Sequence, residues 1–301
     1  MKSIPDISIV IVNFNGVEDT TELLNSLTDY CSDISHEVIV VDNGSSSDEA
    51  ELLRSRFKNH NIIRSEINLG FAGGNNAGIQ QSKGRYLFLL NNDTVIENDS
   101  LKKLIEFMDS NPIAGAVSPK ILFYYSKDII QYAGFTELSD ITLRNRGIGF
   151  GDKDLGQYSK PQQTAFTHGA AMIVRRDVIN EVGLMPECYF LYYEEYDWCE
   201  MFKRAGFKLW YYPDFHVLHK ESRSTGKISN SKIYYLTRNR LMFADRNRKG
   251  AVKALSLLYQ IFVAGSVAML RQAKSGNIQG VNAVLSGIKD FLIKREGKWN
   301  K

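Results

Sequence analysis

A carboxylate directly follows a continuous apolar run in this 301-residue sequence. Residues 86–94 read YLFLLNNDT, so Asn91, Asn92 and Asp93 come where the hydrophobic run ends. A short continuous apolar run is typical of a strand that is covered on both faces, and the ligands of open α/β sheets bind beyond the carboxyl ends of such strands. Asp93 is therefore expected at a ligand site, where its oxygens would suit a divalent cation.

A second candidate for chemistry is the segment FLYYEEYDWCEMFKRAG, residues 190–206, which places Glu194, Glu195 and Asp197 within four positions among aromatic residues. Acids in the first turn of a helix can simply complement its dipole and cap its free amides. Alternatively, partial burial among aromatic side chains raises the pKa of a carboxyl group towards the range that suits a general base. The residues alone leave both interpretations open.

The elements that must position these residues follow from the pattern of the first 120 positions. Apolar runs predict strands at 7–15, 36–43, 61–66 and 85–93, and helical spacing or a glycine-rich helix start follows the first three, at 20–30, 49–57 and 70–84. Such alternation predicts a parallel, doubly wound α/β sheet with right-handed crossovers.

Polar residues gather where the predicted strands end. Any one of them is explained by ordinary turn chemistry, but the carboxyl ends of parallel strands meet at one edge of a sheet, so four groups in register favour a nucleotide-binding crevice. The groups, in chain order, are Asn13 with Asn15, Asp42 with Asn43, Gly73-Gly74-Asn75-Asn76, and Asn92 with Asp93.

Two common phosphate-binding motifs are absent from the sequence. The first strand is followed by NFNGVED rather than G-x-G-x-x-G, the later Gly70, Gly73, Gly74 and Gly78 have a different spacing, and no G-x-x-x-x-G-K-[ST] occurs. Phosphates held without a lysine-bearing loop usually need a divalent metal, which prefers oxygen ligands such as Asp93.

The carboxyl-terminal part of the chain has a different composition. From Arg238 onward 13 Lys and Arg oppose three acids, a net +10, so the preceding residues carry −7 of the overall +3. Residues 254–270 are uncharged, at the low edge of the roughly 17 to 25 residues that a spanning helix needs. The residues permit a helix buried against the rest of the protein or one lying in a membrane interface, and favour a true span least.

Seven stretches together resemble an inverting family 2 glycosyltransferase with a GT-A fold, of the bacterial rhamnosyltransferase-like branch. They lie in the family's order between residues 8 and 243. The resemblance implies a dTDP- or UDP-linked sugar donor, Mg²⁺ or Mn²⁺, and direct displacement at the anomeric carbon by a glycan or lipid-linked glycan acceptor, in cell-surface polysaccharide synthesis. The stretches are SIVIVNFNG, EVIVVDNGSSSD, NLGFAGGNNAGI, GRYLFLLNNDT, GAAMIVRRD, FLYYEEYDWCEMFKRAG and YYLTRNRLMF.

The resemblance also implies roles for individual residues of the donor site. Asp42 is expected to contact the nucleotide base. NND takes the place of the family's D-x-D metal motif, with Asn91 in the position of the first carboxylate and Asp93 as the charged ligand. His219, but not His216, matches a histidine that can reach the metal. The remaining residues expected to bind the nucleotide sugar are Asn13, Asn15, Asn43, Gly73, Gly74, Asn75 and Asn92.

The base of the family is the second acid of an E-D pair, which maps to Glu195, one methylene longer than the usual aspartate. Asp197 is the alternative base, and Glu194 is expected to orient the acceptor. Trp198 and Tyr193 would offer flat faces to sugar rings. The irregular residues 123–163 are expected to form acceptor loops, whereas the pattern gives His168 no role.

These observations divide the chain into a GT-A domain, 1–237, and a basic helical extension, 238–301. The domain comprises a nucleotide-binding half, 1–120, and an acceptor and catalytic half, 121–237. Three cysteines without zinc-type spacing and no recognisable signal segment predict a cytoplasmic protein. The basic extension and its uncharged run predict a protein that is peripheral on the inner face of the membrane, bound to an anionic lipid surface. No nucleic-acid-binding module is recognised. The alternative function is a catalytically weak protein of the same fold that binds a nucleotide sugar or a glycan.

Overall fold

The computed structural model describes residues 4–220 and 229–299. Its amino-terminal half contains the predicted parallel strands, with β1 between β2 and β4. The parallel half of the sheet is therefore confirmed, and β1 ends at Asn13 rather than at Asn15. The strands are β1 (Ile7–Asn13), β2 (His36–Asn43), β3 (Asn61–Ser65) and β4 (Tyr86–Asn91).

Three helices connect these strands: α1 (Val17–Tyr30), α2 (Glu49–Arg56) and α3 (Gly70–Gln81). α3 packs closely on β1 and β2, since a Cβ on Gly78 would lie 2.3 Å from Val10 Cγ1. Gly73 and Gly74, which the sequence predicts in a turn, lie inside α3 instead. The turn comes earlier, at Gly70, whose φ of +78° favours glycine.

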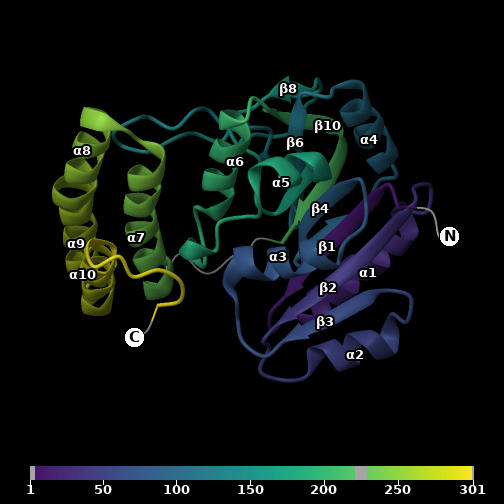
Figure 1. Cartoon of the computed structure of the whole chain (residues 1–301), viewed down its shortest axis with the longest axis horizontal. Helices are drawn as coiled ribbons and strands as arrows, with labels where there is room; N and C mark the ends of the chain where they lie inside the picture. The colour runs from purple at the N-terminus through teal and green to yellow at the C-terminus, as the bar shows by residue number, and fades with distance from the viewer. Residues whose placement is uncertain (1–3, 221–228, 300–301) are drawn as a thin grey trace.

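The second half of the sheet is mixed. β9 runs antiparallel between β4 and β6, whereas β10 is parallel to β6, giving the order β3-β2-β1-β4-β9-β6-β10-β5 (Figure 1). The irregular region expected at 123–163 contains β7, β8 and the loops between them. The elements are β5 (Thr94–Ile96), α4 (Leu101–Ser110), β6 (Ala114–Phe123), β7 (Ser126–Tyr132), β8 (Gln162–Gln163), β9 (Ala171–Arg175), α5 (Arg176–Val182), the 3₁₀ turn η1 (Glu187–Tyr189), α6 (Glu194–Arg204) and β10 (Lys208–His219).

The carboxyl-terminal extension is helical, and it lies beside α6 at the end of the molecule opposite α2 (Figure 1). The boundary predicted between residues 237 and 238 falls inside α7, so we place the start of this unit at Asn230. Its helices are α7 (Asn230–Asn247), α8 (Gly250–Leu258), the π-helical segment η2 (Tyr259–Ala264), α9 (Gly265–Lys274) and α10 (Ile278–Leu292).

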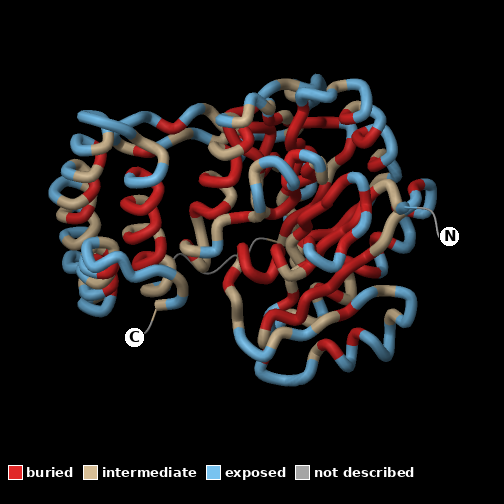
Figure 2. Tube along the Cα trace, viewed as in Figure 1, coloured by how far each residue is buried: buried red, intermediate tan, exposed pale blue. Residues whose placement is uncertain are grey.

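α8, η2 and α9 form one continuous helix, Gly250–Lys274, which is long and apolar enough to cross a membrane by length and composition alone. Only 17% of its most apolar window is buried inside the protein. Figure 2 shows the corresponding pattern, because red buried positions line the side of the helix that faces α7 and the outer side is largely exposed. The helix is therefore not a core helix of the catalytic domain.

Candidate active site

Two adjoining cavities open beyond the carboxyl ends of the parallel strands. The larger, about 930 Å³, is bounded by β1, β2, β4 and the start of α3, and on its far side by α7 and the end of the chain. The smaller, about 240 Å³, is lined by the start of α6 and by residues 167–170, which precede β9. Phe71, Asn91 and Leu191 line both cavities. The first has the position expected for a donor nucleotide, and the second holds the acidic cluster.

Asp93 and His219 lie together at the junction of the two cavities. His219 Nε2 is 3.2 Å from Asp93 Oδ1, and its Nδ1 is hydrogen-bonded to Gln131 Oε1 at 2.9 Å. Burial works to raise the pKa of Asp93, but the hydrogen bond and charge of His219, with the charge of Lys220, hold that pKa below its usual value. Asp93 is therefore an anion at neutral pH, as a metal ligand must be.

The other oxygen and nitrogen donors near this pair are few. Among the described residues no group of three His, Cys, Asp or Glu side chains is placed to hold a metal. Asn91 lines both cavities and offers an amide oxygen. Asp93, His219 and Asn91 fit a cation that takes the rest of its coordination from a diphosphate and water. His219 belongs to the stretch FHVLHKESRSTG, residues 215–226, of which residues 221–226 lie outside the described residues.

His168 lines the acceptor cavity beside this pair. Its Nδ1 accepts a hydrogen bond from the backbone N–H of Ala170, and its ring stacks on Phe135 with centroids 5.9 Å apart. Burial, with the nearby charge of His219, lowers the pKa of His168 to about 3. His168 is thus a neutral, fixed wall of the cavity.

Glu194 and Glu195 begin α6, and both carboxyl groups line the smaller cavity. Glu194 Oε1 accepts from the N–H of Tyr192, whereas the Oε2 atoms of Glu194 and Glu195 have no hydrogen-bond partner in the part of the chain that the structure describes. Burial raises the pKa of both acids, and the charge of Glu195 raises that of Glu194 further. A buried carboxyl oxygen without a partner is costly, which makes this pair of acids the candidate to exchange a proton with a ligand in the cavity.

The loop before α6 has an unusual backbone. Phe190, Tyr192 and Tyr193 have φ values of 68°, 69° and 80°, a region that side chains other than glycine rarely adopt. Two buried residues of α7 hold this loop. The amide of Asn239 donates to the carbonyl oxygens of Tyr189, Leu191 and Tyr192 at 2.8 to 3.0 Å, and Arg238 Nη2 donates to that of Tyr189 at 2.7 Å. The strained loop sets the direction in which Glu195 points.

We expect Asn239→Ala to lower turnover at least tenfold with little change in donor affinity, because the carbonyls of Leu191 and Tyr192 lose their side-chain donor and the loop that aims Glu195 relaxes. Unfolding should become easier by about 1–3 kcal/mol, the usual cost of unsatisfied buried polar groups. Asn111→Ala is the matched control, since its amide donates to the carbonyl of Phe107 in α4, away from both cavities. Chemical denaturation and steady-state kinetics decide the matter, and equal turnover in the two variants would contradict the positioning role.

Three residues of the predicted acceptor site lie elsewhere. Asp197 is fully buried and bonds to Arg246, Asn247 and Tyr189, so it is not free to act as the alternative base. Trp198 is also fully buried, and its indole N–H donates a hydrogen bond to the carbonyl oxygen of Gly183. Tyr193 is buried and accepts from Arg240. None of the three lines either cavity; Tyr192 and Tyr196 provide the aromatic walls instead.

The residues that the sequence predicts to bind the nucleotide sugar divide into those that line the larger cavity and those that do not. Asn43, Asn92 and Asp93 line the larger cavity, whereas Asp42 is fully buried and accepts from the backbone N–H groups of Ser45 and Ala50, which does not fit its expected contact with a base. The other predicted residues hold the scaffold. Asn13 donates to Glu49, Asn15 accepts from Ser46, and Gly73, Gly74 and Asn75 lie within α3.

Sequence reasoning missed the wall of the larger cavity that comes from the end of the chain. Lys298 and Trp299 line this cavity together with Tyr235 of α7. The Trp299 ring stacks on Tyr234 with centroids 4.3 Å apart, and Arg238 Nη1 donates to the carbonyl of Gly297 at 2.8 Å. The only sequence signal for this wall was the aromatic and basic composition of residues 298 and 299.

This fold and site define an α/β protein with its cavities beyond the carboxyl ends of its parallel strands, where open α/β sheets bind their ligands. The chain belongs to glycosyl transferase family 2, whose model matches residues 8–183. It is 27% identical over 97% of its length to the low-salt glycan biosynthesis hexosyltransferase Agl10 of Haloferax volcanii, 93% of which is covered.

Two further relatives transfer rhamnose by name. The dTDP-rhamnosyl transferase RfbF of Shigella flexneri is 26% identical, with 80% of this chain and 81% of the relative covered. The N-acetylglucosaminyl-diphospho-decaprenol L-rhamnosyltransferase of Mycobacterium tuberculosis is 24% identical, with 81% and 88% covered.

Solved structures share the fold at low identity. A mannosyltransferase from Pyrobaculum calidifontis in complex with GDP-Man and Mn²⁺ superposes with a TM-score of 0.61 at 12% identity, covering 98% of this chain and 89% of that one. GalNAc-T7 with UDP, GalNAc and Mn²⁺ gives 0.61 at 14% identity, and the match covers 89% of this chain but only 58% of GalNAc-T7. The predicted GT-A fold is thereby confirmed.

Proposed function

We propose that this glycosyltransferase inverts the anomeric carbon as it moves a sugar, rhamnose or a similar hexose, from a dTDP- or UDP-linked donor. The acceptor is a glycan or a lipid-linked glycan of cell-surface polysaccharide, and the enzyme works peripherally on the cytoplasmic face of the membrane. The observation that carries the proposal is the buried carboxyl of Glu195, whose Oε2 has no hydrogen-bond partner among the described residues, in a cavity that adjoins the larger one at Asp93 and His219.

In the proposed reaction the acceptor hydroxyl lies in the smaller cavity and gives its proton to Glu195 as its oxygen attacks the anomeric carbon. The bond between that carbon and the diphosphate oxygen breaks on the opposite side, and the nucleoside diphosphate leaves through the larger cavity. Inversion requires a base and a leaving group on opposite sides of the sugar, which the two cavities allow.

The donor would be held mainly by residues of the larger cavity. Phe14 is half exposed there and offers a flat face to a pyrimidine base, and Asn43 and Asn68 offer polar groups. Asp93, His219 and Asn91 would hold Mg²⁺ or Mn²⁺. Such a cation supplies Lewis-acid stabilisation of the departing diphosphate.

The direct test is to incubate the full chain with dTDP-rhamnose, UDP-hexoses and GDP-mannose in Mg²⁺ or Mn²⁺, with and without a candidate acceptor, and to measure release of the nucleoside diphosphate. We expect release from dTDP- or UDP-sugars that rises when an acceptor is added. Donor binding without release from any sugar would overturn the catalytic proposal and favour the binding protein.

We expect Lys298→Ala to weaken the binding of dTDP or UDP about two- to fivefold, because Lys298 lines the larger cavity and an exposed charge gains at most about 1 kcal/mol from an opposite charge. Lys294→Ala removes an equally exposed charge that does not line the cavity. Isothermal titration in excess Mn²⁺ compares the two variants, and equal affinities would remove the chain end from the donor site.

A further inference from the structure

The outer side of the helix Gly250–Lys274 carries a row of exposed apolar side chains. Phe262 is 66% exposed and Leu270 is 60% exposed, and the others are about half exposed. Isolated exposed hydrophobic residues are normal, but a continuous row of them marks an interaction surface. We call this row the outer stripe; its members are Leu255, Leu258, Phe262, Val263, Val267 and Leu270.

The π-helical segment η2 keeps the outer stripe on one side of the helix. Leu255 and Leu258 precede this segment, Phe262 and Val263 lie in it, and Val267 and Leu270 follow it. If the whole helix were α-helical, residues 255, 258 and 262 would be out of phase with residues 263, 267 and 270. The step from Leu258 to Val263 is five residues, which is one π turn. π turns are rare, and this one aligns both halves of the stripe.

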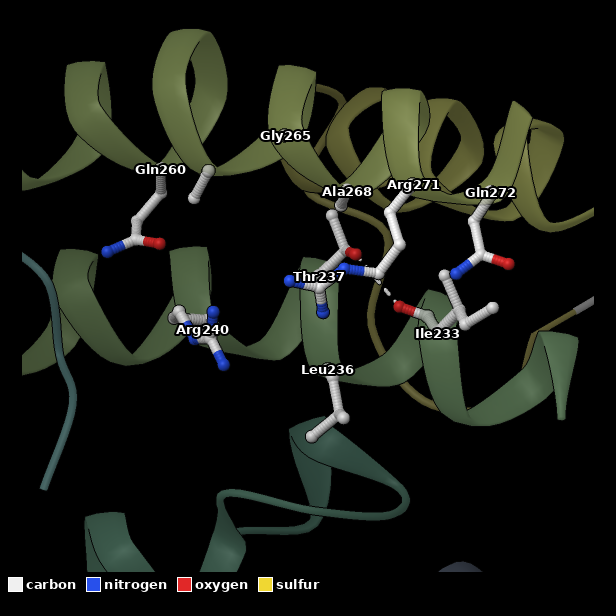
Figure 3. Close-up of a pocket in the computed structure, with 10 residues that line it drawn as sticks. Ile233, Leu236, Thr237, Arg240, Gln260, Gly265, Ala268, Arg271 and Gln272 are labelled. Carbon is white, nitrogen blue, oxygen red and sulfur yellow. Dashed lines mark hydrogen bonds between the residues drawn. The ribbon is translucent and has the colours of Figure 1, made fainter. Parts of the chain in front are cut away.

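The inner side of the same helix packs against the rest of the protein. Figure 3 shows Gln260, Gly265 and Ala268 facing α7 across a cavity of about 180 Å³. Ser256 Oγ and Gln260 Nε2 both donate to the carbonyl oxygen of Ile141 at 2.9 Å, and a Cβ on Gly265 would lie 3.0 Å from Ile288 of α10. A helix that spanned a membrane would lose these contacts, so the structure favours a helix lying on a surface.

Positive charge accompanies the stripe. Residues 249–299 contain eight Lys and Arg against Asp290 and Glu296, a net +6. Lys249, Lys274 and Lys289 are exposed at or near the ends of the helices. Leu285 and Leu292 of α10 add exposed apolar area. A second copy of this face would be repelled by its own charge, whereas an anionic lipid surface would attract it.

We propose that the outer stripe, with α10 and the flanking lysines, docks the protein on an anionic membrane surface without spanning it. An amphipathic helix with basic flanks binds at the boundary between headgroups and acyl chains. The consequence for the substrate rests on the proposed function: α7, which carries this helix, also lines the larger cavity through Ser231 and Tyr235, so docking would hold the site beside a lipid-linked acceptor.

The test is sedimentation of the full chain with phosphatidylcholine vesicles, with and without phosphatidylglycerol, over a range of salt. We expect binding to the anionic vesicles alone, weakened by salt. The double variant Leu258→Gln, Phe262→Gln should lower the vesicle partition coefficient at least tenfold, because two large apolar side chains can no longer be buried in the membrane interface. Lys249→Gln and Lys274→Gln should each lower it about fivefold at low salt.

Ile113→Gln with Leu155→Gln is the matched control, since both side chains are exposed and lie on the catalytic domain. It should bind vesicles like the unchanged protein. Equal losses in the control and the stripe variant, binding that ignores lipid charge and salt, or a dimer in analytical ultracentrifugation that the stripe variant abolishes, would each overturn the proposal. Titration of the stripe variant with dTDP should give unchanged affinity, so that failure of docking is distinguishable from failure of the donor site.

Discussion

Glu195→Gln is expected to lower kcat by roughly 10²- to 10⁴-fold, the range for loss of a general base, while donor affinity stays nearly unchanged. The substitution keeps the shape of the side chain and removes its ability to accept a proton. The carboxyl lies in the smaller cavity, whereas the nucleotide is expected in the larger one. Single-turnover rates and nucleotide titration measure the two quantities separately.

The thermal stability of Glu195→Gln, unlike its turnover, is not expected to fall. Burial raises the pKa of Glu195, so ionising it in the folded protein costs stability as the pH rises above the ordinary pKa of a glutamate, and the amide removes that cost. The melting temperature of Glu195→Gln at neutral pH should therefore be unchanged or higher. A residue that merely capped α6 would behave differently, with about 1 kcal/mol of stability lost and turnover intact.

Two companion variants sharpen this test. Glu195→Asp restores the residue usual in the family but shortens its reach, so reduced yet measurable turnover is expected. Glu200→Gln is the matched control, because Glu200 lies on the same helix and pairs with Lys203 at 2.8 Å, outside both cavities. The raised pKa also predicts that activity declines as the pH falls through it, because the base becomes protonated. Normal turnover in Glu195→Gln would remove Glu195 from the mechanism.

Asp93→Asn is expected to lower kcat/KM by roughly 10² or more and to abolish the effect of Mn²⁺ on nucleotide binding, since a Lewis acid at a departing phosphate contributes several kcal/mol. The variant removes the carboxylate that pairs with His219 at the junction of the two cavities. In the unchanged protein, Mn²⁺ with dTDP should raise the melting temperature more than dTDP alone, whereas in Asp93→Asn the two should be equal.

Asp109→Asn is the control for this second result. Asp109 accepts from Tyr86 and Arg85 at the opposite end of β4, so its loss should cost some stability and leave the metal response intact. Removal of divalent metal from the unchanged protein with EDTA, followed by measurement of turnover, tests the metal site independently. Undiminished turnover in EDTA would refute the metal site, even if Asp93→Asn were inactive for another reason.

The parallel half of the sheet and its ligand-binding edge could be predicted because the relevant forces are local. A run such as YLFLLNND forms a buried strand by its own apolar content and ends where polar residues begin. Asn43, Asn91, Asn92 and Asp93 follow from that rule and line the larger cavity. Asp42 does not line the larger cavity, although it precedes Asn43 on the same strand. Alternate side chains of a strand point to opposite faces of the sheet, so a difference of one residue decides which side chain meets the ligand.

The acidic helix shows the limit of local reasoning. Glu194, Glu195 and Tyr196 at the start of α6 line the smaller cavity, whereas Asp197 and Trp198 are fully buried, so the phase of the helix decides which acids meet a ligand. That phase is set by the strained loop at Tyr192 and Tyr193, which Asn239 holds from more than 45 positions away. The sequence pattern within residues 190–206 therefore cannot predict the contact of this loop with Asn239.

By itself the sequence determined the parallel sheet, the acids and the presence of an apolar helix in a basic extension, since these depend on composition and short-range periodicity. The tertiary structure alone decided which acids line the smaller cavity, that Lys298 and Trp299 line the larger one, and which side of residues 250–274 is exposed. The physical reason is the same in each case: burial and pairing depend on contacts between segments far apart in the chain, here through α7.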